Sequence, residues 1–171
     1  MKIEVKSVKH AAFASQETMC FTADLYVNGT KLGSVRNEGC GGANIFEVYG
    51  REVRAVMDEA DAYCKTLPKV SNEFDSEHPL SMDLEFFVTL LVSREVAKKE
   101  LRNLLKSKIV IQKPSDPETY TVKLKPGFKP TEDLCKKYQE QNPGITVMNL
   151  LPFEVALNRY EKETYEPLIH A

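Results

Sequence analysis

Apolar and polar residues alternate most clearly between Met19 and Val27. The odd-numbered positions of this stretch are all apolar, whereas Thr22 and Asp24 lie on the other face, as in a strand with one buried side. Asn28-Gly29 follows directly, and this dipeptide favours a type I′ turn because both central residues need a positive φ. The pattern therefore predicts a β-hairpin whose return strand runs from Thr30 to Asn37.

A two-residue loop also predicts the register of this hairpin, because pairing then proceeds outward from the turn. The expected cross-strand pairs are Val27 with Thr30, Leu25 with Leu32, Ala23 with Ser34, Phe21 with Arg36, and Cys20 with Asn37.

Further elements are expected on both sides of the hairpin, with strands at Ile3–Val8 and Ile45–Tyr49. A first helix ends at Pro68, and its buried face repeats at helical spacing. That face comprises Val53, Val56, Met57, Ala60, Tyr63, Cys64 and Leu67.

Residues 69–79 are expected to form a surface loop. A second helix follows, with Ser81 as its N-cap, Asp83 and Glu85 near its positive end, and an apolar stripe of Leu84, Phe87, Val88, Leu91, Leu101, Leu104 and Leu105.

The last third of the chain predicts a second hairpin, with strands at 108–112 and 119–124 around a proline-containing turn. Thr131 is the expected N-cap of a short helix that ends at Asn142-Pro143-Gly144. A short strand at 145–148 and a final helix starting near Pro152 complete the series. The tail after Glu161 is expected to fray.

These elements predict an α+β fold, because strands and helices do not alternate regularly. We expect an N-terminal antiparallel β-hairpin or sheet packed with three to four helices and a second hairpin. The length of 171 residues suits a single domain. Within that domain, residues 1–50 are β-rich, 51–106 contain two helices, and 107–165 contain a hairpin plus short helices.

Charge and composition restrict the function and the location. There are 23 Lys and Arg against 25 Asp and Glu, so no global field would hold a polyanion, and nucleic-acid binding is disfavoured without being excluded. The alternating N-terminus is unlike a signal peptide, and no apolar stretch is long enough to span a membrane. We therefore expect a cytoplasmic protein that has no membrane partner. Its four cysteines are widely spaced and are interpreted as reduced thiols, with two disulfides in a secreted protein as the alternative.

The segment from Asn37 to Asn44 contains three glycines and is the main candidate for a binding site. Backbone N–H groups in such a loop can form a concave nest for a phosphate or another anion. The order of residues matches neither a P-loop nor a dinucleotide-binding fingerprint, and a bulged turn between two strands is the alternative. The candidate ligand- or partner-binding residues are Asn37, Glu38, Gly39, Cys40, Gly41, Gly42 and Asn44.

Other polar residues are weaker candidates for catalysis, metal binding or nucleic-acid binding. Cys40 is flanked by glycines and could use His10 or His78 as a base, but nothing adjacent in sequence lowers its pKa. Cysteine and histidine spacings match no metal motif. Asp58 and Asp61 are expected on a solvated helix face. The basic cluster of Lys98, Lys99, Arg102, Lys106 and Lys108 is interpreted in the same way. We assign no catalytic residue, metal or cofactor.

One stretch carries a family resemblance, through Glu17, Thr18, Cys20, Phe21, Asn28, Gly29, Asn37, Gly39, Gly41 and Gly42. An E-T-x-C-F strand, an N-G turn and an N-x-G-x-G-G loop succeed one another there. The segment resembles small uncharacterised proteins of bacteriophages and other mobile elements, and the later Asn149–Phe153 also fits. Members of that group often carry His and Cys around the glycines, whereas this chain has Cys40 and Ala43, which weakens metal or thiol chemistry at the loop.

The resemblance implies a phage or mobile-element accessory protein of a bacterial host. We expect stoichiometric binding, for example inhibition of a host defence system, through a host protein or a nucleotide signal held at the glycine-rich loop. One alternative is a nucleotide-acting enzyme that uses Cys40, His10 or Glu38. Another is a nucleic-acid-associated accessory protein that uses the lysine-rich end of the second helix.

Overall fold

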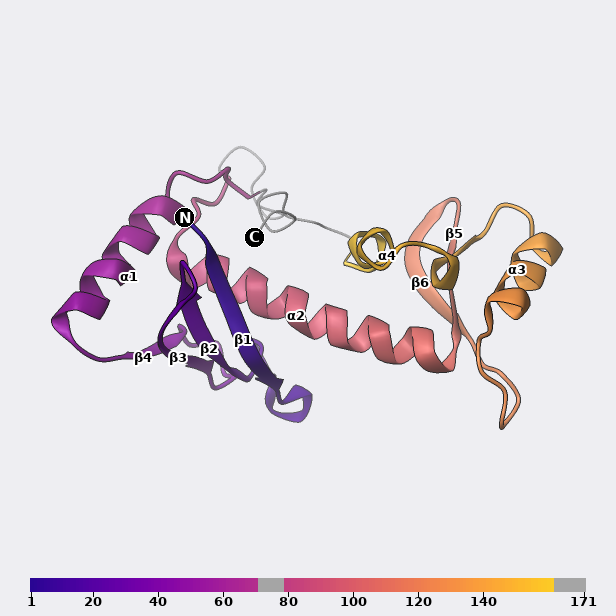
Figure 1. The fold of residues 1–171 in the computed structure, drawn as a ribbon, viewed down its shortest axis with the longest axis horizontal. Helices are drawn as coiled ribbons and strands as arrows, with labels where there is room; N and C mark the ends of the chain where they lie inside the picture. The colour runs from indigo at the N-terminus through magenta and orange to yellow at the C-terminus, as the bar shows by residue number, and fades with distance from the viewer. Residues whose placement is uncertain (71–78, 162–171) are drawn as a thin grey trace. The chain divides into compact units, whose positions relative to one another are not determined.

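The structure is a computed structural model that describes residues 1–70 and 79–161. The described chain divides into two compact units, an N-terminal unit up to Glu95 and a C-terminal unit that starts at Val96 (Figure 1). Each contains a sheet and helices, so the expected α+β class is confirmed. The single domain expected from the length stays a prediction.

The N-terminal unit contains a four-stranded antiparallel sheet in the order β1-β2-β3-β4. Its strands are β1 (Ile3–His10), β2 (Phe21–Val27), β3 (Thr30–Asn37) and β4 (Ile45–Val48). Asn28 and Gly29 take φ values of 49° and 82°. The expected tight turn between β2 and β3 is therefore confirmed.

The predicted register of this hairpin holds next to the turn but is wrong from Leu25 onward. Val27 faces Thr30 as expected, but Leu25 faces Gly33 in place of Leu32, and a register shift separates Leu25 from Tyr26. Leu32 is thus the extra residue of a β-bulge. The physical reason is burial: an unbroken register would have turned Ser34 and Arg36 toward the core. The bulge instead buries Leu32 and, three residues later, Val35.

The shift changes every pair farther from the turn. Ala23 faces Val35 instead of Ser34, and Phe21 faces Asn37 instead of Arg36. Cys20, expected opposite Asn37, precedes the start of β2. A second irregularity lies in β1 between Lys6 and Lys9, where Ser7 takes a φ of 55°.

Helix α1 (Arg51–Cys64) has the expected buried face, with Ala60 and Cys64 fully buried. Asp61 does not lie on a solvated face as predicted. Its carboxylate accepts the N–H of Leu84 at 3.0 Å and pairs with Lys65 at 2.6 Å. It thereby links the end of α1 to the start of the next helix.

Helix α2 (Leu84–Ser107) begins later than the sequence suggested. The side chain of Asp83 accepts the N–H of Phe86 at 2.8 Å, so Asp83, and not Ser81, has the position and bonding of the N-cap. The reason is tertiary, because Asp61 supplies a second acceptor that fixes the first turn at Leu84.

The C-terminal unit contains a three-stranded sheet in the order β6-β5-β7. Its strands are β5 (Ile109–Lys113), β6 (Asp116–Val122) and β7 (Thr146–Val147), and β5 and β6 form the expected second hairpin. Helices α3 (Glu132–Gln141) and α4 (Phe153–Tyr160) follow at the expected places. Thr131 caps α3 as predicted, accepting the N–H of Leu134 at 3.4 Å.

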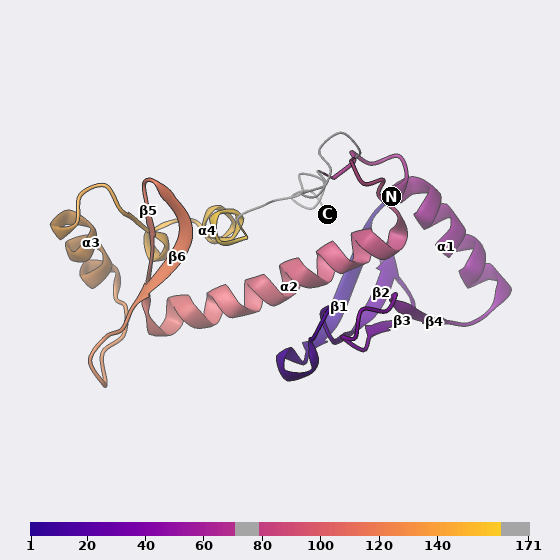
Figure 2. The same cartoon turned by 180° about the vertical axis from the view of Figure 1, so that it is seen from behind.

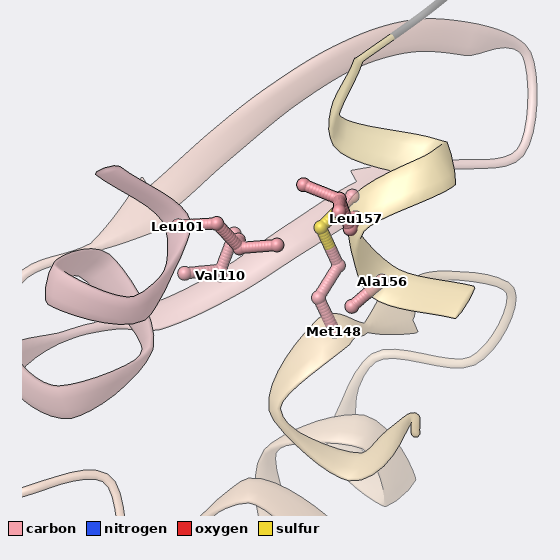
Figure 3. Packing of buried hydrophobic residues seen from close by; sticks show 5 residues of the cluster. All are labelled: Leu101, Val110, Met148, Ala156 and Leu157. Atoms are coloured by element: carbon pink, nitrogen blue, oxygen red, sulfur yellow. The ribbon is translucent and has the colours of Figure 1, made fainter. Parts of the chain in front are cut away.

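Two hydrophobic clusters bury neighbouring residues of β5, whose side chains alternate between the faces of the sheet. Val110 packs with residues of α2, α4 and the short 3₁₀ turn at Met148–Leu150 (Figure 3). That cluster comprises Leu101, Val110, Met148, Ala156 and Leu157. Ile109 and Ile111 pack with Cys135 of α3 and Val147 of β7.

The side chain of Asn149 forms hydrogen bonds to the backbone at the junction of α2 and β5. Its side chain accepts the N–H of Val110 at 2.8 Å and donates to the carbonyls of Leu105 and Lys108. These bonds give Asn149 a structural role at the start of β5.

Three expectations concern residues 71–78 or 162–171: most of the surface loop at 69–79, the fraying tail after Glu161, and His78 as a base. These lie outside the described residues. Within the described ranges, no helix combines the length and the apolar composition needed to cross a membrane.

Candidate functional site at the glycine loop

The glycine loop, residues 37–44, joins β3 to the neighbouring strand β4 and is organised by the side chain of Asn37. This side chain is 7% exposed. Its oxygen accepts from the hydroxyl of Thr18 and the N–H of Gly39, and its amide donates to the carbonyl of Gly42 and the side-chain oxygen of Asn44, all within 2.8–3.0 Å. All four bonds of one buried amide therefore serve to shape the loop.

Gly39 connects the loop to the segment between β1 and β2. Its carbonyl accepts the N–H groups of three consecutive residues, 16 to 18, at 2.9–3.3 Å. Its φ is +85°, and a Cβ at this position would collide with the carbonyl oxygen of Ala14. Only glycine meets both requirements.

Gly41 and Gly42 differ in their surroundings. Gly41 has a φ of +84°, donates its N–H to the hydroxyl of Thr18 at 3.2 Å, and a Cβ on it would meet the carboxylate of Glu17. A Cβ on Gly42 would have no heavy atom within 4 Å. Gly42 is therefore the position at which a side chain can be added to the surface without disturbing the loop.

Asn44 fastens the other end of the loop to α2. Its N–H donates to the carboxylate of Glu85 at 2.8 Å, and its side-chain amide donates to the Glu85 carbonyl at 3.2 Å and the Thr89 hydroxyl at 2.8 Å. The structure thus joins all seven predicted site residues in one braced loop. Their role in binding stays a prediction.

Three backbone N–H groups of the loop already have acceptors within the protein, which leaves fewer of them for the expected anion nest. Those of Gly39, Gly41 and Asn44 have side-chain acceptors. Those of Cys40, Gly42 and Ala43 have none among the described residues. The longest run of free N–H groups in the loop is therefore the pair Gly42 and Ala43, so most of the loop is not available as an anion nest.

A pocket of about 460 Å³ lies beside the loop, where the ends of β1 and β3 meet the start of β2. Strand pairing creates it by aligning His10 with Phe21 and Phe21 with Asn37. This pocket was not predicted from the sequence, because no local pattern indicates which residues of β1 pair with β2. Its lining comprises Lys9, His10, Ala11, Cys20, Phe21, Thr22, Arg36, Asn37 and Glu38.

His10 is held at the wall of the pocket by Ser15. The Ser15 hydroxyl donates to the carbonyl of Ala11 at 3.1 Å and accepts the N–H of Cys20 at 2.9 Å. Its single proton is thus used, so Nε2 of His10, 3.2 Å away, acts as the donor in their contact.

The predicted pairing of Cys40 with His10 receives no support from the geometry. Among the described residues, His10 and Glu38 line the pocket but Cys40 does not. The Cys40 thiol instead lies 3.7 Å from the carbonyl of Glu38. A nucleophile and base in hydrogen-bond reach of each other are therefore not assembled here.

The charges at the pocket are largely balanced. Arg36 forms ion pairs with Glu38 and Glu47. The hydrogen bond with Glu38 has the larger effect in raising the pKa of Arg36, followed by the bond with Glu47. Hydrogen bonds from Ser34 and then Arg36 lower the pKa of Glu47. Lys9 has no ion pair among the described residues, so its charge remains available to a phosphate.

Phe13 is the most exposed large apolar residue in the described part of the chain, at 95%. It lies in the 3₁₀ turn Ala12–Ala14, which is closed by backbone bonds from Ala14 to Ala11 and from Ser15 to Ala12. The next residue, Ala14, contacts Gly39. Both views show the connection between β1 and β2 projecting beyond the sheet (Figures 1 and 2). The sequence assigned no role to this segment, and the exposure of Phe13 was not predicted.

Two of the cysteines, Cys64 and Cys135, are buried. Across the described residues, no group of three or more His, Cys, Asp or Glu side chains is arranged to hold a metal ion. Burial, with Asp61 and Asp83 nearby, raises the pKa of the Cys64 thiol to about 12. Burial also raises the pKa of Cys135.

Comparisons with protein-family models, curated proteins and solved structures found no match for this chain.

Proposed function

We propose that this chain is a phage or mobile-element accessory protein that acts by stoichiometric binding to a host protein. The binding surface consists of Phe13 and the adjacent glycine loop. The observation that carries the proposal is the 95% exposure of Phe13 on a closed turn beside the loop. Aromatic side chains of this kind supply much of the affinity at protein interfaces when they enter a pocket on the partner.

The bracing of the loop supports such a role. The Asn37 bonds and the ties of Asn44 to α2 hold the surface in one conformation before binding. A preordered surface loses less conformational entropy on association, so more of the contact energy appears as affinity. Gly41 and Gly42 are exposed, and the lack of a side chain there lets a partner approach the backbone closely.

The same geometry favours a protein over a nucleotide signal as the ligand. Three loop N–H groups are occupied, and Arg36 is neutralised by two carboxylates. A nucleotide signal remains the second candidate because the pocket of about 460 Å³ is in the range of small-molecule sites, and Lys9 could contact one phosphate.

The resemblance of the segment from Thr18 to Phe46 to phage and mobile-element proteins underlies the biological part of the proposal. In that setting the partner is a component of a host defence system, and the protein acts in the bacterial cytoplasm by occupying a surface of that component.

The test is capture of the full chain and its partner from host cytosol, followed by native mass spectrometry of the complex. We expect a stoichiometric complex that Phe13→Ala weakens by at least about tenfold, the usual effect of removing an interface anchor. Gly42→Arg should abolish it, because Arg would stand on the open loop surface. Gly42→Ala is the matched control and should bind normally.

Three results would contradict the proposal or redirect it. A complex that survives both Phe13→Ala and Gly42→Arg in folded protein excludes this surface. A bound nucleotide in the native spectrum that is lost on Lys9→Ala would favour the second candidate. Turnover of a nucleotide that Cys40→Ser or His10→Ala suppresses would favour the enzyme alternative.

A further inference from the structure

The near-neutral charge of the whole chain conceals a difference between its two units. Residues 96–164 contain thirteen Lys and Arg against nine Asp and Glu, a net charge of +4. The remaining residues contain ten against sixteen, a net charge of −6. The balance that disfavoured nucleic-acid binding for the chain as a whole therefore does not apply to the C-terminal unit.

Part of this positive charge lies in the loop between β6 and α3, residues 123–130. Both views show this loop, orange in the colour scale, projecting well beyond the sheet of its unit (Figures 1 and 2). At its tip the N–H of Phe128 donates to the carbonyl of Lys125 at 3.0 Å, and Gly127 has a φ of +85°. With Pro126 and Gly127 at its centre, this is the pattern of a type II turn, so the tip is defined.

The loop presents an aromatic ring between cations. Phe128 is 65% exposed, and Lys123, Lys125 and Lys129 are also exposed. None of the three lysines forms an ion pair within residues 1–70 and 79–161. Their charges are therefore available to a ligand.

We propose that the loop of residues 123–130 binds single-stranded nucleic acid. Phe128 stacks on an exposed base, while Lys125 and Lys129 contact the flanking phosphates. Aromatic rings interleaved with cations are the recurring means of holding single strands without sequence preference, because every base offers a flat face. A single protruding ring suits unstacked bases, which a duplex does not offer.

An anionic membrane is the other polyanion that an exposed Phe among lysines can bind. The loop has one exposed aromatic residue and no amphipathic helix, so it would insert little apolar area. The observations therefore favour nucleic acid, and the membrane becomes an outcome of the test.

The experiment measures binding of the full chain to a fluorescent oligothymidylate of about 16 nucleotides. We expect binding that weakens as salt rises, and a loss of about tenfold in Phe128→Ala, the effect of one base stack. Lys125→Gln and Lys129→Gln should each reduce the slope of log K against log salt by about 0.7. Lys137→Gln, an exposed position on α3 with the same charge change, is the matched control, and Phe13→Ala should leave oligothymidylate binding unchanged.

Three outcomes overturn the proposal. The first is no oligothymidylate binding at low salt. The second is equal binding by Phe128→Ala and the wild type, or equal salt slopes for Lys125→Gln and Lys137→Gln. The third is loop-dependent binding to phosphatidylglycerol vesicles without binding to the oligonucleotide. Because Phe13 and Gly42 belong to the other surface, these results are independent of the proposed complex with a host protein.

Discussion

The side-chain amide of Asn37 donates a hydrogen bond to the side-chain oxygen of Asn44 at 3.0 Å, joining the last residue of β3 to the residue before β4. Asn44 in turn bonds to Glu85 and Thr89 of α2. Two asparagines therefore hold a loop in which Gly39 is buried and Gly41 and Gly42 are exposed.

Replacement of Asn37 by Ala should destabilise the protein. It would remove four hydrogen bonds and leave the Gly39 N–H and the Gly42 carbonyl without their partner. A buried polar group left unpaired costs about 1–3 kcal/mol, and we expect a loss of that order in the free energy of unfolding, measured with urea. A change below about 0.5 kcal/mol would mean that water or a rearranged loop replaces these bonds.

Gly39→Ala and Gly42→Ala form a matched pair of substitutions in one loop. Gly39→Ala should destabilise by about 1–3 kcal/mol, because it combines a left-handed backbone with a collision against Ala14. Gly42→Ala should be neutral or slightly stabilising, since its Cβ meets open space. Thermal or urea denaturation of both variants measures the difference, and equal stabilities would contradict the geometry of the loop.

The four cysteines should react with a thiol reagent at very different rates. Cys40 is exposed, whereas Cys64 and Cys135 are fully buried and their pKa values are raised, which disfavours the reactive thiolate. We expect a fast phase that Cys40→Ser removes, and labelling of Cys64 and Cys135 only after unfolding in guanidinium. Fast labelling of Cys64 in the native protein would show that the end of α1 opens readily.

Acid should weaken the link between α1 and α2 through Asp61. Its hydrogen bond with Lys65, and then the N–H of Leu84, lower the pKa of Asp61 below its ordinary value of 3.8. Its stabilising contribution is therefore complete above that value and is lost as the pH falls through the lower, folded-state pKa. In urea titrations across this range, Asp61→Asn should lose less stability with acid than the wild type. Parallel pH profiles would contradict this role.

Elements with short-range signals could be predicted from the sequence. The Asn28-Gly29 turn, the buried face of α1 and the Thr131 cap all depend on residues within a few positions of one another. The seven loop residues were selected in the same way, from a local concentration of glycine. Their bracing was not predictable, because Thr18, Glu85 and Thr89 come from segments far along the chain.

The sequence by itself determined the α+β class, the order of the elements and the position of the glycine loop, because periodicity, turn residues and caps act locally. Tertiary structure decided the rest. Packing placed Val35 in the core and thereby imposed the bulge at Leu32, and Asp61 fixed where α2 begins. The exposure of Phe13 and of Phe128 also emerged only there, since whether an aromatic ring is buried depends on what the folded chain brings over it.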